Sequence, residues 1–153
     1  MAAVYKTKLS FLLFFIVLAH FSCSPLIASF DQYSYVQTTS LKVEALALMD
    51  KAAEPFNRHE AEAKDLRLSM DKLYEYELHK PKNVITTKMW FKIKDPNAHL
   101  MGYFIKRWEN EGKLNPFYIE ELKPIMEQAF DQVAELESKK IKESEVSGSI
   151  FKF

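Results

Sequence analysis

The chain has 153 residues, with 21 basic and 21 acidic side chains, and hydrophobic residues make up 48% of it. This length suits one domain with a core of its own, and the composition excludes intrinsic disorder and collagen-like repeats. A balanced charge argues against a nucleic-acid partner, which would favour a basic excess. One cysteine cannot form an internal disulfide, and four scattered histidines do not indicate a zinc site. The three glycines form no phosphate-binding loop, so no cofactor is expected.

The amino-terminal segment has the pattern of a secretory signal peptide. Lys6 and Lys8 precede an apolar run over 11–19 that continues to Phe21, and no acidic residue interrupts it. The run is shorter than the roughly 20 residues that a transmembrane helix needs. We therefore expect residues 1–22 to be a signal peptide, and a retained signal anchor is the alternative.

The single cysteine, Cys23, directly follows this apolar run, with the small Ser22 before it. Residues 1–23 resemble the leader of bacterial lipoproteins, in which the cysteine of a lipobox is diacylated and becomes the mature N-terminus. His20 stands where the lipobox usually has Leu, and Phe21 where a small residue is commoner. The resemblance implies lipidation of Cys23, because two acyl chains give stable membrane anchoring. The alternative is an incidental thiol in a hydrophobic leader.

The rest of the chain divides into three segments. We expect a lipidated tether (23–28), a single helical domain (29–143) and a flexible C-terminal tail (144–153). Phe151 and Phe153 fall in this tail, and we expect neither to be part of the core.

The first two predicted helices are long. One covers about 30–53, with a capping box at Ser29 and Gln32. Its apolar stripe is Tyr33, Val36, Ser40, Val43 and Ala47, widened by Leu41, Leu46, Leu48 and Met49. Pro55 separates it from a second helix that ends near His79. The second helix has a heptad-like seam at Phe56, His59, Ala63, Leu66, Met70, Leu73 and Glu77.

Three shorter or later helices follow. Thr86 or Thr87 caps a helix through Ile93, with Met89, Trp90 and Ile93 on one side. Asp95–Pro96 and Asn115–Pro116 each pair an N-cap with a proline at the first helical position. They predict helices over about 96–111 and 116–142, and Pro124 should bend the last one. No stretch shows strand alternation, so we predict an all-α bundle built on a long antiparallel helical hairpin plus shorter C-terminal helices.

Catalytic motifs are weak in this sequence. His59–Glu60 lacks the second histidine four positions on that a metalloprotease needs, so we expect His59 to be a packed or half-exposed side chain. Carboxylates occur in close pairs, at Glu75 and Glu77 and at Glu135 and Glu137 among others. Helix residues two apart point in different directions, so we interpret these pairs as a solvated face.

One cluster is a candidate binding site: Trp90, Tyr103, Arg107 and Trp108, with Lys106 beside it. One interpretation is an aromatic core that closes the bundle, with Arg107 stacked on a ring. The other is an aromatic-lined groove for a partner segment or a glycan-like ligand. Exposure of the two indoles distinguishes them.

The sequence thus predicts a bacterial envelope lipoprotein at the outer membrane or the periplasmic face of the inner membrane. Its partners would be the lipid bilayer, through acylated Cys23, and an envelope protein. The expected role is a non-enzymatic binding or scaffold module. The alternative is a secreted helical effector or toxin-like protein without a lipid anchor. An enzyme of a helical class is disfavoured, because no acid/base or nucleophile constellation is visible.

Overall fold

A computed structural model describes residues 30–146 and 150–151, and every regular element in this part of the chain is helical. The predicted all-α bundle is confirmed. Cys23 and the leader lie outside the described residues. The elements are α2 (Gln32–Asp50), the 3₁₀ turn η1 (Phe56–Arg58), α3 (Glu60–Leu78), α4 (Val84–Lys94), α5 (Met101–Glu111), α6 (Pro116–Glu137) and α7 (Glu143–Val146). Within these ranges, no helix has both the length and the apolar composition that crossing a bilayer requires.

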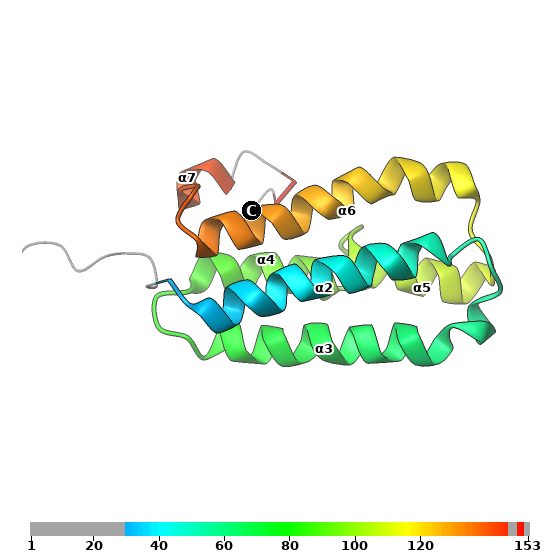
Figure 1. Cartoon of the computed structure of the whole chain (residues 1–153), viewed down its shortest axis with the longest axis horizontal. Helices are drawn as coiled ribbons and strands as arrows, with labels where there is room; N and C mark the ends of the chain where they lie inside the picture. Colours follow the sequence, from blue (N-terminus) through cyan, green and yellow to red (C-terminus); the bar gives the residue numbers. More distant parts are fainter. Residues whose placement is uncertain (1–29, 147–149, 152–153) are drawn as a thin grey trace, which may run out of the picture.

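The helices form four arms that alternate in direction along the chain (Figure 1). α2 packs against α3 and, more extensively, against α6, while α4 packs against α3, α5 and α6. α4 and α5 together make the third arm, which is broken in the middle. The pairing of α2 with α3 is therefore one side of a four-sided arrangement.

The seam of α3 is buried as its spacing predicts. The side chains of Ala63, Leu66, Met70, Leu73 and Glu77 are all buried. α3 itself begins only at Glu60, because Phe56 belongs to η1 and His59 has a non-helical backbone between the two elements. On α4, Met89, Trp90 and Ile93 are buried on one side as expected, although this helix begins at Val84, before either threonine.

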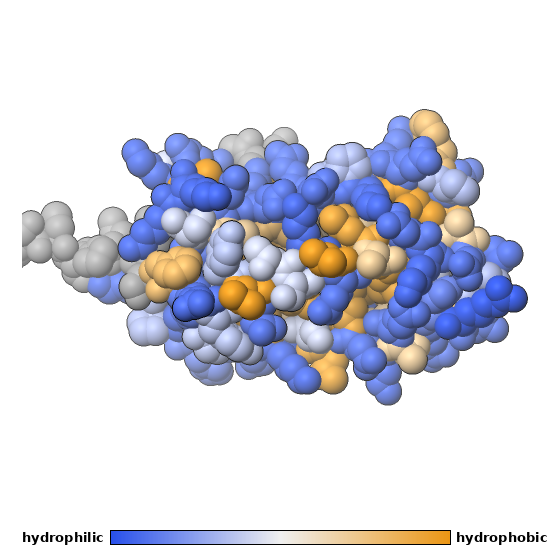
Figure 2. Space-filling view, in the orientation of Figure 1, coloured by the Kyte–Doolittle hydropathy of each residue, from blue (hydrophilic) through white to orange (hydrophobic). Residues whose placement is uncertain are grey.

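The predicted stripe of α2 is wrong, because that face points to solvent. Val43 is 67% exposed and Tyr33 53% exposed, and Figure 2 shows patches of hydrophobic surface over α2 among hydrophilic residues. The buried face is formed by Ser34, Thr38, Leu41, Ala45, Leu48 and Met49, one or two positions further along the chain. Of the residues predicted to widen the stripe, Leu41, Leu48 and Met49 are therefore buried. Both sets repeat every three or four residues, so spacing alone does not distinguish them. The N-cap of α2 is Asp31, whose carboxylate accepts the amide of Tyr33 at 2.9 Å.

The break in the third arm is also a correction, because the predicted helix over 96–111 begins only at Met101. Asp95 Oδ1 accepts the backbone amide of Asn97 at 3.0 Å, which makes a local turn, and His99 has a left-handed φ of 58° that a helix cannot continue through. Gly102 then packs directly on the end of α4, since a Cβ at this position would lie 2.0 Å from the carbonyl oxygen of Lys94. Only glycine allows α5 to begin so close to α4.

The carboxyl-terminal part also differs from expectation. α6 continues through Pro124 and ends at Glu137, although the sequence predicts a helix to about residue 142. The short helix α7 then forms at the start of the segment that the sequence predicts as a flexible tail (Figure 1). Val146 and Phe151 are fully buried in the core. The expectation that Phe151 lies outside the core is therefore wrong, while Phe153 lies outside the described residues. An apolar side chain in a polar segment can add to a core when the chain folds back over it.

Truncation of Leu66 on the α3 seam should destabilise the protein. Leu66 is 4% exposed at the centre of the seam, so Leu66→Ala should lower the free energy of unfolding by about 2–5 kcal/mol through the cavity that it leaves. Leu68 on the same helix is 50% exposed. Leu68→Ala should change the free energy of unfolding by no more than about 0.5 kcal/mol. Urea denaturation of both variants measures the difference. Equal effects would contradict the packing direction of α3.

Candidate functional site

The two tryptophans of the predicted aromatic cluster are part of the core. Trp90 and Trp108 are both 0% exposed, so neither lines an open groove. Trp108 packs edge-on against Phe56, with 5.2 Å between ring centroids, and its Nε1 donates to the carbonyl oxygen of Glu54 at 3.0 Å. Trp90 packs in the same manner against Phe130 at 5.8 Å. The core interpretation is the one that this burial supports.

Tyr103 and Arg107 are only partly buried, and each contacts residues outside the predicted cluster. The Tyr103 ring lies 4.7 Å from that of His99. The guanidinium of Arg107 lies 4.1 Å above the ring of Tyr118, and its Nε donates to Glu111 at 2.6 Å. Arg107 therefore stacks on a ring as anticipated, although that ring is a tyrosine of α6. The four residues do not form one surface.

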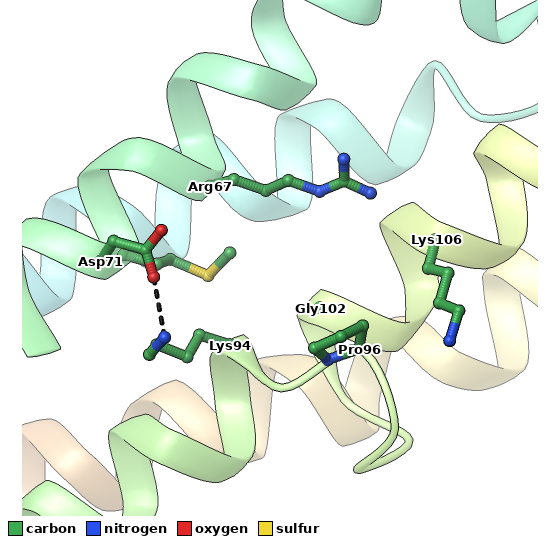
Figure 3. Close-up of a pocket in the computed structure, with 7 residues that line it drawn as sticks. Arg67, Asp71, Lys94, Pro96, Gly102 and Lys106 are labelled. Atoms are coloured by element: carbon green, nitrogen blue, oxygen red, sulfur yellow. Dashed lines mark hydrogen bonds and ion pairs between the residues drawn. The ribbon is translucent and has the colours of Figure 1, made fainter.

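A different site lies beside the break in the third arm. It is an open cleft of about 420 Å³ between α3 and the junction of α4 with α5 (Figure 3). The cleft is lined by Arg67, Met70, Asp71, Lys94, Pro96, Gly102 and Lys106. Because α3, the end of α4, the turn and α5 all contribute, the cleft exists only where the chain interrupts the third arm.

Three cationic side chains surround this cleft, and two of them are paired with carboxylates. Arg67 Nη2 lies 2.8 Å from Glu109, and Lys94 Nζ lies 2.8 Å from Asp71. Lys106 Nζ donates to the neutral amide oxygen of Asn97 at 3.1 Å. These five charged side chains leave one positive charge in excess. Both carboxylates are about half exposed, so their ion pairs contribute little to stability.

The sequence gives almost no signal for this cleft. Arg67, Lys94 and Lys106 lie in or directly after different predicted helices and belong to no motif. Only Lys106 lies next to a predicted site, the aromatic cluster. What brings the three together is the turn after Lys94, which the sequence predicts as the start of a helix.

A second cluster of charges is buried at the end of the bundle where α2 begins. Glu77 on α3 is 0% exposed and Glu137 on α6 is 5% exposed. Lys80 Nζ lies between them, 3.2 Å from Glu77 and 2.8 Å from Glu137. The interpretation of Glu77 and Glu137 as parts of a solvated face is therefore wrong. Both helix faces turn inward here, and the single positive charge of Lys80 lies between the two carboxylates.

Every carboxylate oxygen in this cluster has a donor. Ser34 on α2 donates to Oε1 of Glu77, and Asn83 and Lys80 face Oε2. Thr86 on α4 donates to Oε1 of Glu137 at 3.1 Å, and Lys80 donates to Oε2. A buried polar network that is satisfied throughout holds its members in one arrangement. This network joins all four arms of the bundle.

Burial and pairing shift the pKa values of this cluster. Burial would lower the pKa of the Lys80 ammonium, but the hydrogen bond and charge of Glu137 outweigh it and raise the pKa. Burial raises the pKa of the Glu137 carboxyl, and the nearby charge of Glu77 adds to this, against the opposing effect of Lys80. Lys80 therefore stays protonated at neutral pH, whereas the Glu137 carboxyl takes up a proton at a higher pH than an exposed one does.

His59 lies near the opposite end, in the connection between α2 and α3. Its Nδ1 lies 3.1 Å from Glu62, and its Nε2 lies 3.1 Å from Glu54. The hydrogen bond with Glu62, followed by that with Glu54, raises the pKa of the imidazole above 6.5. The ring also lies 5.7 Å from the Trp108 ring. His59 is therefore a packed side chain between two carboxylates, in agreement with the expectation of a packed or half-exposed histidine. Within the described part of the chain, no group of three or more histidine, cysteine or acidic side chains is placed to hold a metal ion.

Comparison of the chain with models of known protein families, with curated proteins and with solved structures finds no match.

Removal of the Lys80 charge should destabilise the bundle in a pH-dependent way. Lys80→Gln leaves Glu77 and Glu137 buried without a counter-ion, so the free energy of unfolding should fall by about 3–5 kcal/mol at neutral pH. The loss should shrink as pH falls toward about 5, because the Glu137 carboxyl, whose pKa burial raises, then takes up a proton and the repulsion is removed. Denaturation at both pH values measures this. Lys72→Gln, on the exposed side of α3, is the control and should change little. A loss that is independent of pH would contradict the role of Lys80 as a counter-ion.

The imidazole of His59 should titrate above pH 6.5 in the folded protein. Because this pKa is raised, the stability that His59 contributes is present below about pH 6.5 and is lost as pH rises through the folded-state pKa. Nuclear magnetic resonance titration of the ring protons measures the value, and Glu62→Gln and Glu54→Gln should each lower it. A pKa that neither substitution changes would show that the two carboxylates do not act on His59.

Proposed function

We propose that the protein is a bacterial envelope lipoprotein, anchored through acylated Cys23, whose helical domain is a non-enzymatic binding module. The observation that carries the binding role is the open cleft at the break in the third arm, where side chains from α3, α4 and α5 converge. Binding residues are often found on turns and loops that a rigid scaffold holds in place, as at this interruption of the third arm. The proposed location in the cell envelope rests on the lipobox-like leader.

The start of the folded domain suits a short tether. Helix α2 begins at Gln32, close in the chain to Cys23. Its cap, Asp31, accepts the hydroxyl of Tyr76 at 2.6 Å and lies 3.8 Å from Lys80 Nζ. These contacts fix the first turn of α2 onto α3. An acyl anchor at Cys23 would hold this end of the bundle near the membrane.

Replacement of the predicted lipidation site tests the anchor. Cys23→Ser should move the protein from the membrane fraction to the soluble fraction, because no acyl chain can then be attached. Intact mass of the unsubstituted protein should show two or three acyl chains on a mature N-terminus at Cys23. The control is Ser24→Ala, which keeps the cysteine and should leave the protein in the membrane.

Two outcomes would overturn the lipoprotein assignment. Membrane retention of Cys23→Ser would favour a retained signal anchor. A soluble, unacylated protein with a mature N-terminus beyond Cys23 would favour the secreted helical protein.

A further inference from the structure

We infer that the cleft between α3 and the α4–α5 junction binds a compact dianionic phosphate group. This inference deepens the proposed binding function by naming the ligand chemistry of the same cleft. Its three cationic groups, Arg67, Lys94 and Lys106, come from different elements and line one open space (Figure 3). With Asp71 and Glu109 counted, the cleft keeps one positive charge in excess, and such an excess raises the local concentration of anionic ligands.

Two of the three cations, Arg67 and Lys94, already each hold a carboxylate, so both can reach an oxyanion. The carboxylates of Asp71 and Glu109 each lie 2.8 Å from a cationic nitrogen. Asp71 is 56% exposed and Glu109 49% exposed, so both can turn to solvent at small cost. A ligand oxyanion would then take their place on Arg67 and Lys94, and Arg67 offers a planar fork that matches phosphate oxygens.

The charge count favours a dianion over a monoanion. Lys106 supplies the positive charge that Asp71 and Glu109 do not balance, and its Nζ has only the amide oxygen of Asn97 among its described partners. When Asp71 and Glu109 turn to solvent, Arg67 and Lys94 also lose their paired carboxylates, so three cations line the cleft without one. A phosphate monoester carries close to two negative charges at neutral pH and neutralises two of them, whereas a carboxylate neutralises one.

A second cleft provides an internal comparison. It has a volume of about 310 Å³, lies between α2 and α3, and is lined by Glu44, Glu62 and Asp65 among others. That surface repels anions. The two clefts lie on either side of α3. We expect an anionic ligand to bind the cleft that carries the cations and not the acidic one.

The source of the phosphate group is either a soluble phosphate or a phospholipid headgroup. Met70 and Pro96 add apolar surface beside the cations, which would contact the acyl or glyceryl part of a lipid. The two sources share the chemistry that the cations recognise. They differ in whether the apolar lining adds affinity.

Titration of the full chain, purified in micelles of a zwitterionic detergent at constant chloride concentration, tests the inference. Inorganic phosphate should shift the amide resonances of Gly102 and its neighbours in a saturable manner. Arg67→Gln and Lys106→Gln should each weaken binding about tenfold, the effect of one lost charge-assisted contact. Lys113→Gln removes the same charge from an exposed position outside the cleft and should have no such effect.

Substitutions of acidic residues give the opposite sign. Asp71→Asn removes the carboxylate that competes with the ligand and should tighten phosphate binding. Asp65→Asn makes the same change of charge on the acidic side of α3 and should leave it unchanged. Thermal unfolding of each variant confirms that the fold is retained, as expected for exposed ion pairs.

A second arm of the titration identifies the source. Water-soluble dihexanoyl phosphatidic acid should bind more tightly than inorganic phosphate if the cleft takes a headgroup, and equally if it takes a soluble phosphate. Absence of saturable shifts with both probes, or equal weakening by Lys113→Gln and Arg67→Gln, would overturn the inference. The membrane partition of Cys23→Ser is independent of these results, so the anchor would stand or fall separately.

Discussion

The ammonium group of Lys80 holds together charges that would otherwise push the bundle apart. Glu77 and Glu137 are buried on α3 and α6, and burial of two carboxylates costs several kcal/mol unless a cation compensates them. Lys80 lies within 3.2 Å of both. The remaining donors come from α2 and α4, so one network reaches every arm of the fold. Apolar packing alone tolerates a helix sliding along its neighbour, whereas hydrogen bonds to fixed oxygens do not. The network therefore sets the register of the four arms.

This network also explains which parts of the fold could be predicted from the sequence. The seam of α3 was predictable because its apolar residues repeat in a single register. On α2, two sets of positions repeat every three or four residues, and the buried set contains the polar Ser34 and Thr38. The burial of Ser34 depends on Glu77, a residue of another helix, to which it donates a hydrogen bond. A local pattern does not contain that information.

The candidate site was less predictable than the fold. The aromatic cluster was identified from large side chains in neighbouring segments, but Trp90 and Trp108 turned out to fill the core, as large apolar side chains commonly do. Arg67, Lys94 and Lys106 resemble solvated charges until the third arm is known to break. That break depends on the left-handed backbone of His99 and on the absence of a side chain at Gly102. Only Pro96 marks the region in the sequence, and proline there is equally compatible with a helix start.

The contacts at Asp31 have a mechanical consequence. The carboxylate of Asp31 caps α2, accepts the Tyr76 hydroxyl at 2.6 Å and lies 3.8 Å from Lys80 Nζ, so the point at which the chain enters the bundle is fastened to both α2 and α3. A tensile force on the preceding chain would load these bonds in parallel, and they would have to rupture together. A helix fastened only by its own backbone would instead unwind one hydrogen bond at a time under the same load. The start of α2 therefore resists a pull with more than its own backbone hydrogen bonds.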